Sequence, residues 1–102
     1  MVNDALSELI SKKTQQGEVT LEQIRVFGTN WCGDCRRARR VLDERQVDYE
    51  WNDIDQDKTA ESFVKQTNQG HRSVPTIIFP DESILVEPSN QELINKLQAL
   101  GY

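Results

Sequence analysis

The sequence predicts an α/β protein with a four-stranded mixed sheet and helices on both faces. Short apolar segments typical of strands alternate with amphipathic segments typical of helices along the chain. A strand–helix–strand unit is followed by two strand segments joined by a turn, so the sheet should combine parallel and antiparallel pairs. The 102 residues suffice for one compact domain and not for two.

An extra helix is predicted near the N-terminus, over residues 4–13. Apolar side chains recur on one face of this segment, which is the pattern of an amphipathic helix. We therefore divide the chain into an N-terminal helical extension, residues 1–20, and a main domain, residues 21–102.

The main domain contains four strand segments and three helical segments. The strands are predicted at residues 24–27, 49–51, 76–79 and 84–86, and the helices at residues 32–46, 57–68 and from residue 89 onward. The turn Pro80-Asp81-Glu82-Ser83 joins the last two strands, which should pair as a hairpin. Gly70 follows the second helix at a position where helices commonly end. Ser89 and Glu92 have the spacing of a capping box at the start of the last helix.

Each predicted helix presents one apolar stripe for packing against the sheet. The inward-facing residues are Ala38, Val41 and Leu42 in the first helix, Ala60, Phe63 and Val64 in the second, and Leu93, Ile94, Leu97 and Leu100 in the last. These stripes indicate a core and carry no prediction of a cofactor.

The charge and the hydropathy pattern narrow the function classes. The formal net charge of −5 argues against sequence-independent nucleic-acid binding, which needs a basic surface. No apolar run reaches the length of a membrane span, and the first residues lack the basic start and apolar stretch of a secretory signal. We therefore expect a cytoplasmic monomer with neither nucleic acid nor membrane as a partner.

Both cysteines lie in one motif, Trp31-Cys32-Gly33-Asp34-Cys35. A disulfide between residues three apart closes almost no loop, so it adds little stability and its value is chemical. A structural zinc site needs four ligands, whereas the chain offers two cysteines and one histidine, His71. The motif therefore predicts redox chemistry and no metal site.

The position of the motif assigns roles to the two thiols. It stands where a predicted strand passes into a predicted helix, and unpaired N–H groups at a helix start stabilise an anion. The Cys32 thiol should therefore ionise more easily than a free cysteine. Cys35 lies about one helical turn further on and deeper. We predict that Cys32 attacks a disulfide and that Cys35 resolves the mixed disulfide.

The segment from Val26 to Cys35 resembles a glutaredoxin-type active site, and Ser73-Val74-Pro75-Thr76 resembles the Thr-Val-Pro segment of that family. The resemblance covers roughly residues 23–100 and implies a thioredoxin-like fold. It also implies that Pro75 is cis and faces the cysteines. The backbone of Val74 would then be exposed to an extended substrate.

The same resemblance implies a low-molecular-weight thiol, glutathione or mycothiol, as the reducing cosubstrate, with no tightly bound cofactor. Its main chain would pair with Val74, and the γ-glutamyl carboxylate of glutathione would lie at the start of the last helix, at Ser89 and Asn90. Glutaredoxins usually have a Gly-Gly-x-Asp-Asp-like segment there, where this chain has Glu87-Pro88-Ser89-Asn90. That ending and Trp31-Cys32-Gly33 also resemble mycoredoxin-like proteins, which use mycothiol.

Further substrate contacts are assigned to residues around the cysteines. Trp31 should shield one side of Cys32, and Gly33 and Asp34 lie between the two thiols. The Asp34 carboxylate either tunes the neighbouring thiolate or simply suits the positive start of the helix. Arg72 lies in the loop before the proline and should border the substrate groove.

A run of arginines follows the motif on the predicted helix. Arg39 can pair with Asp43, and Arg40 with Glu44, at i,i+4 spacing, which is typical of a solvated face. Arg36 and Arg37 lack such partners in the pattern. We hypothesise that one of them supports the thiolate or an anionic thiol ligand.

The sequence thus predicts a dithiol redoxin that reduces protein disulfides or mixed disulfides and is reset by a small thiol. Three alternatives stay open. The protein could be recharged by mycothiol or by a flavin-dependent thioredoxin reductase. It could carry an iron–sulfur cluster shared by two chains through Cys32. It could also be an adaptor that binds partners without catalysis.

Overall fold

The computed structural model describes residues 23–102 of the chain. The helix predicted at residues 4–13 and the extension predicted at residues 1–20 lie outside the described residues. Within residues 23–102, no helix combines the length and the apolar character that are needed to cross a bilayer.

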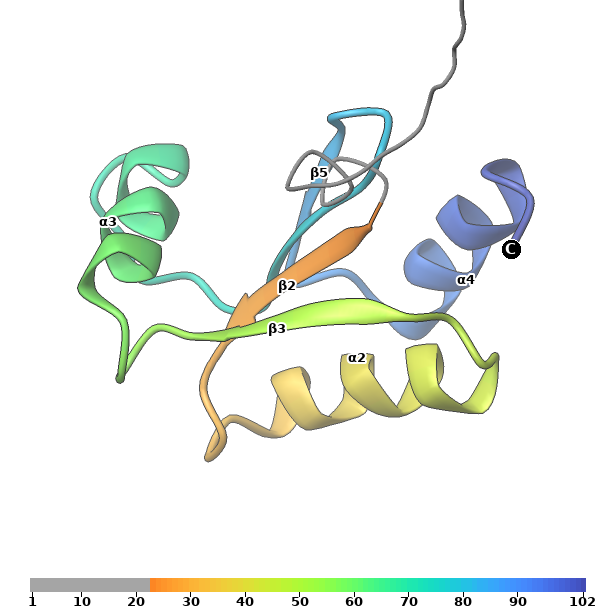
Figure 1. Ribbon diagram of the computed structural model, residues 1–102, viewed down its shortest axis with the longest axis horizontal. Helices are drawn as coiled ribbons and strands as arrows, with labels where there is room; N and C mark the ends of the chain where they lie inside the picture. Colours follow the sequence, from red (N-terminus) through yellow and green to blue (C-terminus); the bar gives the residue numbers. More distant parts are fainter. Residues whose placement is uncertain (1–22) are drawn as a thin grey trace, which may run out of the picture.

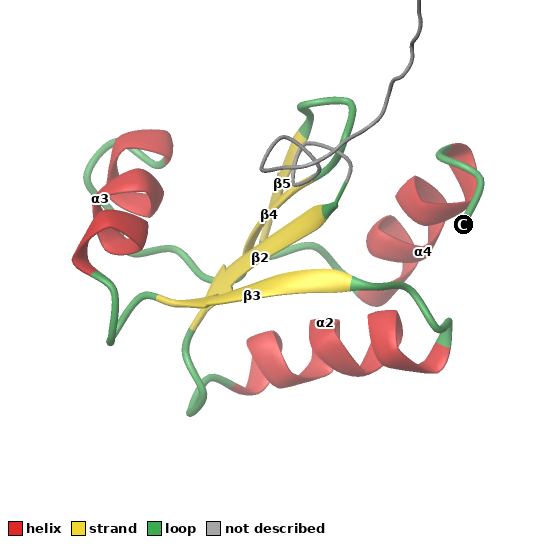
Figure 2. Ribbon diagram, in the orientation of Figure 1, coloured by secondary structure: helices red, strands yellow, loops and turns green. Residues whose placement is uncertain are grey.

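Four strands and three helices follow one another in the predicted order (Figures 1 and 2). They are β2 (Ile24–Gly28), α2 (Gly33–Glu44), β3 (Tyr49–Asp53), α3 (Lys58–Thr67), β4 (Thr76–Ile78), β5 (Ile84–Val86) and α4 (Asn90–Ala99). Their ends differ from the predicted ones by no more than about two residues, which is the usual uncertainty of helix and strand ends. The predicted order of elements is therefore confirmed.

The strands form one mixed sheet in the order β3-β2-β4-β5. β2 and β3 are parallel, whereas β4 is antiparallel to both of its neighbours and forms the predicted hairpin with β5. Because β2 and β3 are parallel, their C-terminal ends, Gly28 and Asp53, reach the same edge of the sheet. The start of β4 lies at that edge too, since Thr76 pairs with Phe27. Three loops therefore meet there.

The helices cover both faces of the sheet, with α2 and α4 on one side and α3 on the other (Figures 1 and 2). The larger core lies under α2 and α4 and includes Ile24, Val26, Leu42, Ile77 and Leu97, all fully buried. Alternation along β2 sends Ile24 and Val26 to this face. This packing fixes the position of α2, which contains Cys35 and directly follows Cys32.

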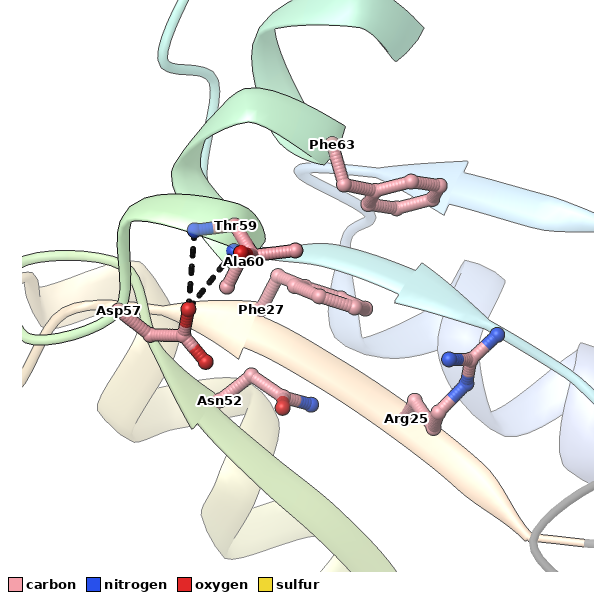
Figure 3. A pocket seen from close by; sticks show the side chains of 7 residues that line it. All are labelled: Arg25, Phe27, Asn52, Asp57, Thr59, Ala60 and Phe63. Atoms are coloured by element: carbon pink, nitrogen blue, oxygen red, sulfur yellow. Dashed lines mark hydrogen bonds between the residues drawn. The ribbon is translucent and has the colours of Figure 1, made fainter.

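The smaller core lies under α3 and surrounds Phe27. The ring centroids of Phe27 and Phe63 are 4.8 Å apart. Asp57 caps α3 by accepting hydrogen bonds from the N–H groups of Thr59 and Ala60 (Figure 3). These five residues line part of a cavity of about 290 Å³ whose lining includes none of the predicted site residues. The cap and this packing thus fix the start of α3, which directly follows the loop after β3.

Candidate active site

Cys32 lies where β2 passes into α2. It is the N-cap residue of α2, has an extended backbone and is partly exposed. Its carbonyl oxygen accepts the Arg36 N–H at 3.1 Å, which begins the helical hydrogen bonds. Among residues 23–102, no side chain caps this helix. The N–H groups of its first turn are therefore available to a negatively charged sulfur at Cys32.

Cys35 lies one turn into α2 and has 0% of its surface exposed. Burial is the main cause that raises the pKa of Cys35 to about 12; Cys32 and Asp34 raise it further, and a hydrogen bond from the Thr29 N–H opposes them. Neither cysteine is in a disulfide bond. The two thiols are therefore unequal, because one is reachable from solvent and the other is buried and protonated near neutral pH.

Gly28, the last residue of β2, makes room for the buried thiol. A Cβ atom at this position would lie 2.5 Å from the Cys35 sulfur and 3.0 Å from the ring of Trp51. Such close approach requires a glycine, which strands otherwise disfavour. The sequence gives a weak signal for this role, since Gly28 ends a strand just before the cysteine motif.

The loop before β4 forms a second wall of the site. The Val74–Pro75 peptide bond is cis, as the family resemblance implies. Pro75 is buried and Val74 is partly exposed. The Thr76 hydroxyl donates to the Ser73 carbonyl oxygen at 2.7 Å and so closes the turn. Because Thr76 is paired with β2, this loop lies beside the segment that leads to Cys32.

Hydrogen bonds join Trp31 to Arg72 through a carboxylate between them. Trp31 Nε1 donates to Asp55 Oδ2 at 2.8 Å, and Arg72 Nη2 donates to Asp55 Oδ1 at 2.6 Å. Arg72 Nε also donates to Glu61 at 2.7 Å. The bond from Trp31, and next the one from Arg72, hold the pKa of Asp55 below its usual value. Arg72, predicted to border the substrate groove, is thus bound to two carboxylates of the protein.

Arg37 connects the start of α2 to the start of α4. Its guanidinium donates to Asp34 at 3.2 Å, to Asn90 Oδ1 at 2.6 Å and to the Pro88 carbonyl oxygen at 3.4 Å. Arg37 has no partner at the i,i+4 spacing that the sequence analysis considered, but Asp34 precedes it by three residues on the same helix face and pairs with it. Asp34 is therefore paired with a cation that also holds the loop before α4.

Arg39 and Arg36 also have partners that the helical spacing did not predict. The Arg39 guanidinium lies 4.0 Å from the centroid of the Trp51 ring, and its Nε donates to the Tyr49 hydroxyl at 3.2 Å. Within the described part of the chain, no ion pair joins Arg39 to Asp43 or Arg40 to Glu44, so both predicted pairs are wrong. Arg39 instead stacks on an aromatic side chain of β3, a favourable contact for a guanidinium. Arg36 donates to the Asn30 carbonyl oxygen at 3.3 Å.

The start of α4, where the resemblance places a carboxylate of glutathione, is capped by its own residues. The Ser89 hydroxyl accepts the Glu92 N–H at 3.1 Å, and the Glu92 carboxylate accepts the Ser89 N–H at 2.8 Å. The predicted capping box is therefore confirmed. A carboxylate of the protein already occupies this helix start, and the Asn90 amide oxygen is bound by Arg37.

The predicted site residues come from several elements that meet at one sheet edge. The patterns in the sequence did not identify Asp55, which joins Arg72 to Trp31, or Glu61, which accepts a further hydrogen bond from Arg72. The available signal for Asp55 was its position just after a strand parallel to β2, but strand order alone does not orient a side chain. In residues 23–102, no group of three His, Cys, Asp or Glu side chains is arranged to hold a metal ion.

Comparison with known proteins identifies similar sequences. The family model named Glutaredoxin matches residues 24–84. A protein of Mycobacterium tuberculosis (strain ATCC 25618 / H37Rv), provisionally named as a glutaredoxin, is 39% identical over 72 residues, which are 71% of this chain and 86% of that protein. Mycoredoxin 1 of Corynebacterium glutamicum is 35% identical over 81 residues, which are 79% of this chain and 100% of that protein.

Solved structures share the fold. The thioredoxin-like protein BC3987 superimposes with a TM-score of 0.59 at 27% identity, covering 76% of this chain and 99% of that one. The glutaredoxin grx-1 of Archaeoglobus fulgidus gives a TM-score of 0.62 at 14% identity, covering 88% of this chain and 100% of that one, a likeness in fold alone. The predicted thioredoxin-like fold is confirmed.

Replacing Gly28 with alanine should destabilise the protein by roughly 1–3 kcal/mol, the usual effect of overpacking. The added methyl group would overlap the Cys35 sulfur. Urea unfolding of the reduced protein measures the change. Gly33→Ala is the matched control, because nothing lies within 4 Å of a Cβ atom at that position. Equal stability of the two variants would contradict the close packing at Gly28.

The raised pKa of Cys35 should make the stability depend on pH. In the unfolded chain a cysteine ionises near pH ~8.5, whereas the folded protein keeps the Cys35 proton up to about pH 12. Above the unfolded-state value the unfolded chain binds fewer protons than the native protein, so stability should fall as pH rises. Urea midpoints at neutral and alkaline pH measure this fall. Cys35→Ser should show a smaller fall, and an equal one would argue against the raised pKa.

Proposed function

Because this chain belongs to the glutaredoxin family, we propose that it is a dithiol thiol–disulfide oxidoreductase. Family membership supports a redox role for its thiols. The observation that carries the finer proposal is the inequality of the two cysteines. Cys32 is partly exposed at the uncapped start of α2, and Cys35 is buried one turn deeper. The substrates are protein disulfides, or mixed disulfides between a protein and a small thiol.

In the first step the Cys32 thiolate attacks one sulfur of the target disulfide. A mixed disulfide forms between Cys32 and one half of the target, and the other half leaves as a thiolate that takes up a proton. The N–H groups at the start of α2 stabilise the attacking sulfur while it is negative. Val74 is partly exposed, and an extended target segment that pairs with its backbone would bind as an added strand does.

In the second step Cys35 attacks the Cys32 sulfur. The Cys32–Cys35 disulfide forms, and the second half of the target leaves as a thiolate that accepts the proton given up by Cys35. Burial keeps Cys35 protonated, and the hydrogen bond and charge of Cys32 raise its pKa further. Those two contributions of Cys32 disappear once its sulfur is in a disulfide. Cys35 is therefore easier to deprotonate when it has to react.

A small thiol then resets the enzyme. One thiol molecule opens the Cys32–Cys35 disulfide by bonding to Cys32, and a second removes the first as a small disulfide, so two thiols supply the two electrons.

Mycothiol and glutathione are the candidates for this small thiol. Two observations favour mycothiol, which has no carboxylate. One relative is named Mycoredoxin 1. In addition, Glu92 at the start of α4, and Asp55 and Glu61 on Arg72, occupy cationic positions that glutathione carboxylates would need.

A panel of reductants tests the proposal with the full chain, Cys32→Ser and Cys35→Ser. Cys32→Ser should lose turnover with every thiol, because it lacks the attacking sulfur. Cys35→Ser should lose reduction of protein disulfides but keep reduction of mixed disulfides, in which a second small thiol replaces Cys35. Turnover is followed by release of the reduced target.

The same panel separates the alternatives. Turnover with thioredoxin reductase and no small thiol would identify a different reductant. Visible absorption after anaerobic purification, lost in Cys32→Ser, would indicate a shared iron–sulfur cluster. Full activity in Cys32→Ser would overturn the proposal altogether.

A further inference from the structure

We propose that Asp55 is a positioning residue that sets the preference of the site for thiols without a carboxylate beside Arg72. The proposal rests on the redox function proposed above. Asp55 is bound on one side by Trp31, which neighbours the attacking Cys32, and on the other by Arg72. One carboxylate therefore holds two groups that border the place where a small thiol would meet Cys32.

The first effect of Asp55 is to anchor Trp31. The Trp31 side chain is 66% exposed, so packing alone restrains it weakly. Its hydrogen bond to Asp55 at 2.8 Å fixes the indole beside the cysteine. Asp55 is itself restrained, because its N–H donates to Asp53 Oδ1 at 2.9 Å. Asp53 in turn accepts a hydrogen bond from the Asn30 side chain at 3.2 Å. The loop after β3 thus holds the cysteine loop at two points.

The second effect is on the charge beside the groove. Arg72 precedes Val74 by two residues, so its guanidinium is the cation of the loop that would receive the thiol. Asp55 and Glu61 lie 2.6 and 2.7 Å from it, and Lys65 lies 3.9 Å from the same Glu61 oxygen. The Arg72 guanidinium is therefore already paired with two carboxylates of the protein. A thiol with a carboxylate at this end would meet two carboxylates instead of an open guanidinium. A neutral thiol meets no such repulsion.

The ion pairs of Arg72 with Asp55 and Glu61 are not explained by a contribution to the stability of the fold. Partly exposed ion pairs of this kind usually contribute little to the free energy of unfolding. The arrangement does, however, join charged side chains through Trp31 to the segment that carries the attacking cysteine, where they can act on an incoming ligand. Specificity against a wrong ligand commonly uses such repulsion.

The experiment compares two reductants that differ only in one charge, glutathione and glutathione whose glycine carboxylate is converted to an amide. The wild-type full chain should have the higher kcat/KM with the amide. Asp55→Asn should reduce the ratio of the two kcat/KM values by roughly fivefold, the effect of one unit charge near ~4 Å in water-like surroundings. Glu61→Gln should reduce it in the same direction while leaving the Trp31–Asp55 bond intact.

Asp48→Asn is the matched control, since Asp48 is exposed and precedes β3 at the opposite edge of the sheet. It makes the same change in net charge and should leave the ratio at its wild-type value. A purely structural role of Asp55 would change both reductants equally and would leave the ratio unmoved.

Each outcome decides one question. Wild-type protein that is inactive with both reductants and with mycothiol would overturn the proposed function itself, and this inference with it. Activity with mycothiol alone would overturn this inference and leave the proposed function standing. Wild-type protein that is active but shows the same ratio as both Asp55→Asn and Glu61→Gln would overturn the role of Asp55 alone. If Asp55→Asn does not fold, Glu61→Gln still tests the charge argument.

Discussion

The uncapped start of α2 beside Cys32 is the constraint on which the rest of the site depends. A helix normally begins under a side-chain oxygen that accepts its first N–H groups, and here a cysteine stands in that position. The same helix carries Cys35 into the core, where burial keeps it protonated. The start of α2 therefore provides one partly exposed thiol, Cys32, and one buried and protonated thiol, Cys35. The sheet, the cores and the surrounding loops serve to hold that element in place.

The surrounding loops are connected to α2 by charged and polar side chains more than by apolar packing. Arg37 connects its first turns to the loop before α4. Asp55 connects Trp31 to the loop before β4 through Arg72. In both connections the arginine, Arg37 or Arg72, binds groups of the protein itself, although its position in the sequence suggested an anionic ligand as its partner. Both arginines are therefore paired within the protein, which under the function proposed above favours an uncharged thiol over a charged one.

The sequence predicted the order of elements and the cysteine pair well, because both depend on local patterns. Apolar periodicity located the helices and strands, and the Ser89–Glu92 spacing located the last helix start. The partners of Arg37 and Arg39, and the whole role of Asp55, could not be predicted in this way. They depend on which side chains the sheet brings together from distant segments, and a helical wheel does not contain that information. Gly28 shows the same limit, since its neighbour Cys35 lies on a different element.

Selective alkylation tests the central claim most directly. The reduced full chain is treated near neutral pH with a small alkylating reagent at limiting concentration, and each cysteine is quantified by peptide mass mapping. The account predicts that Cys32 is modified while Cys35, with its pKa raised to about 12, remains unmodified until the protein is unfolded. Modification of Cys35 in the folded protein as fast as Cys32 would contradict the account.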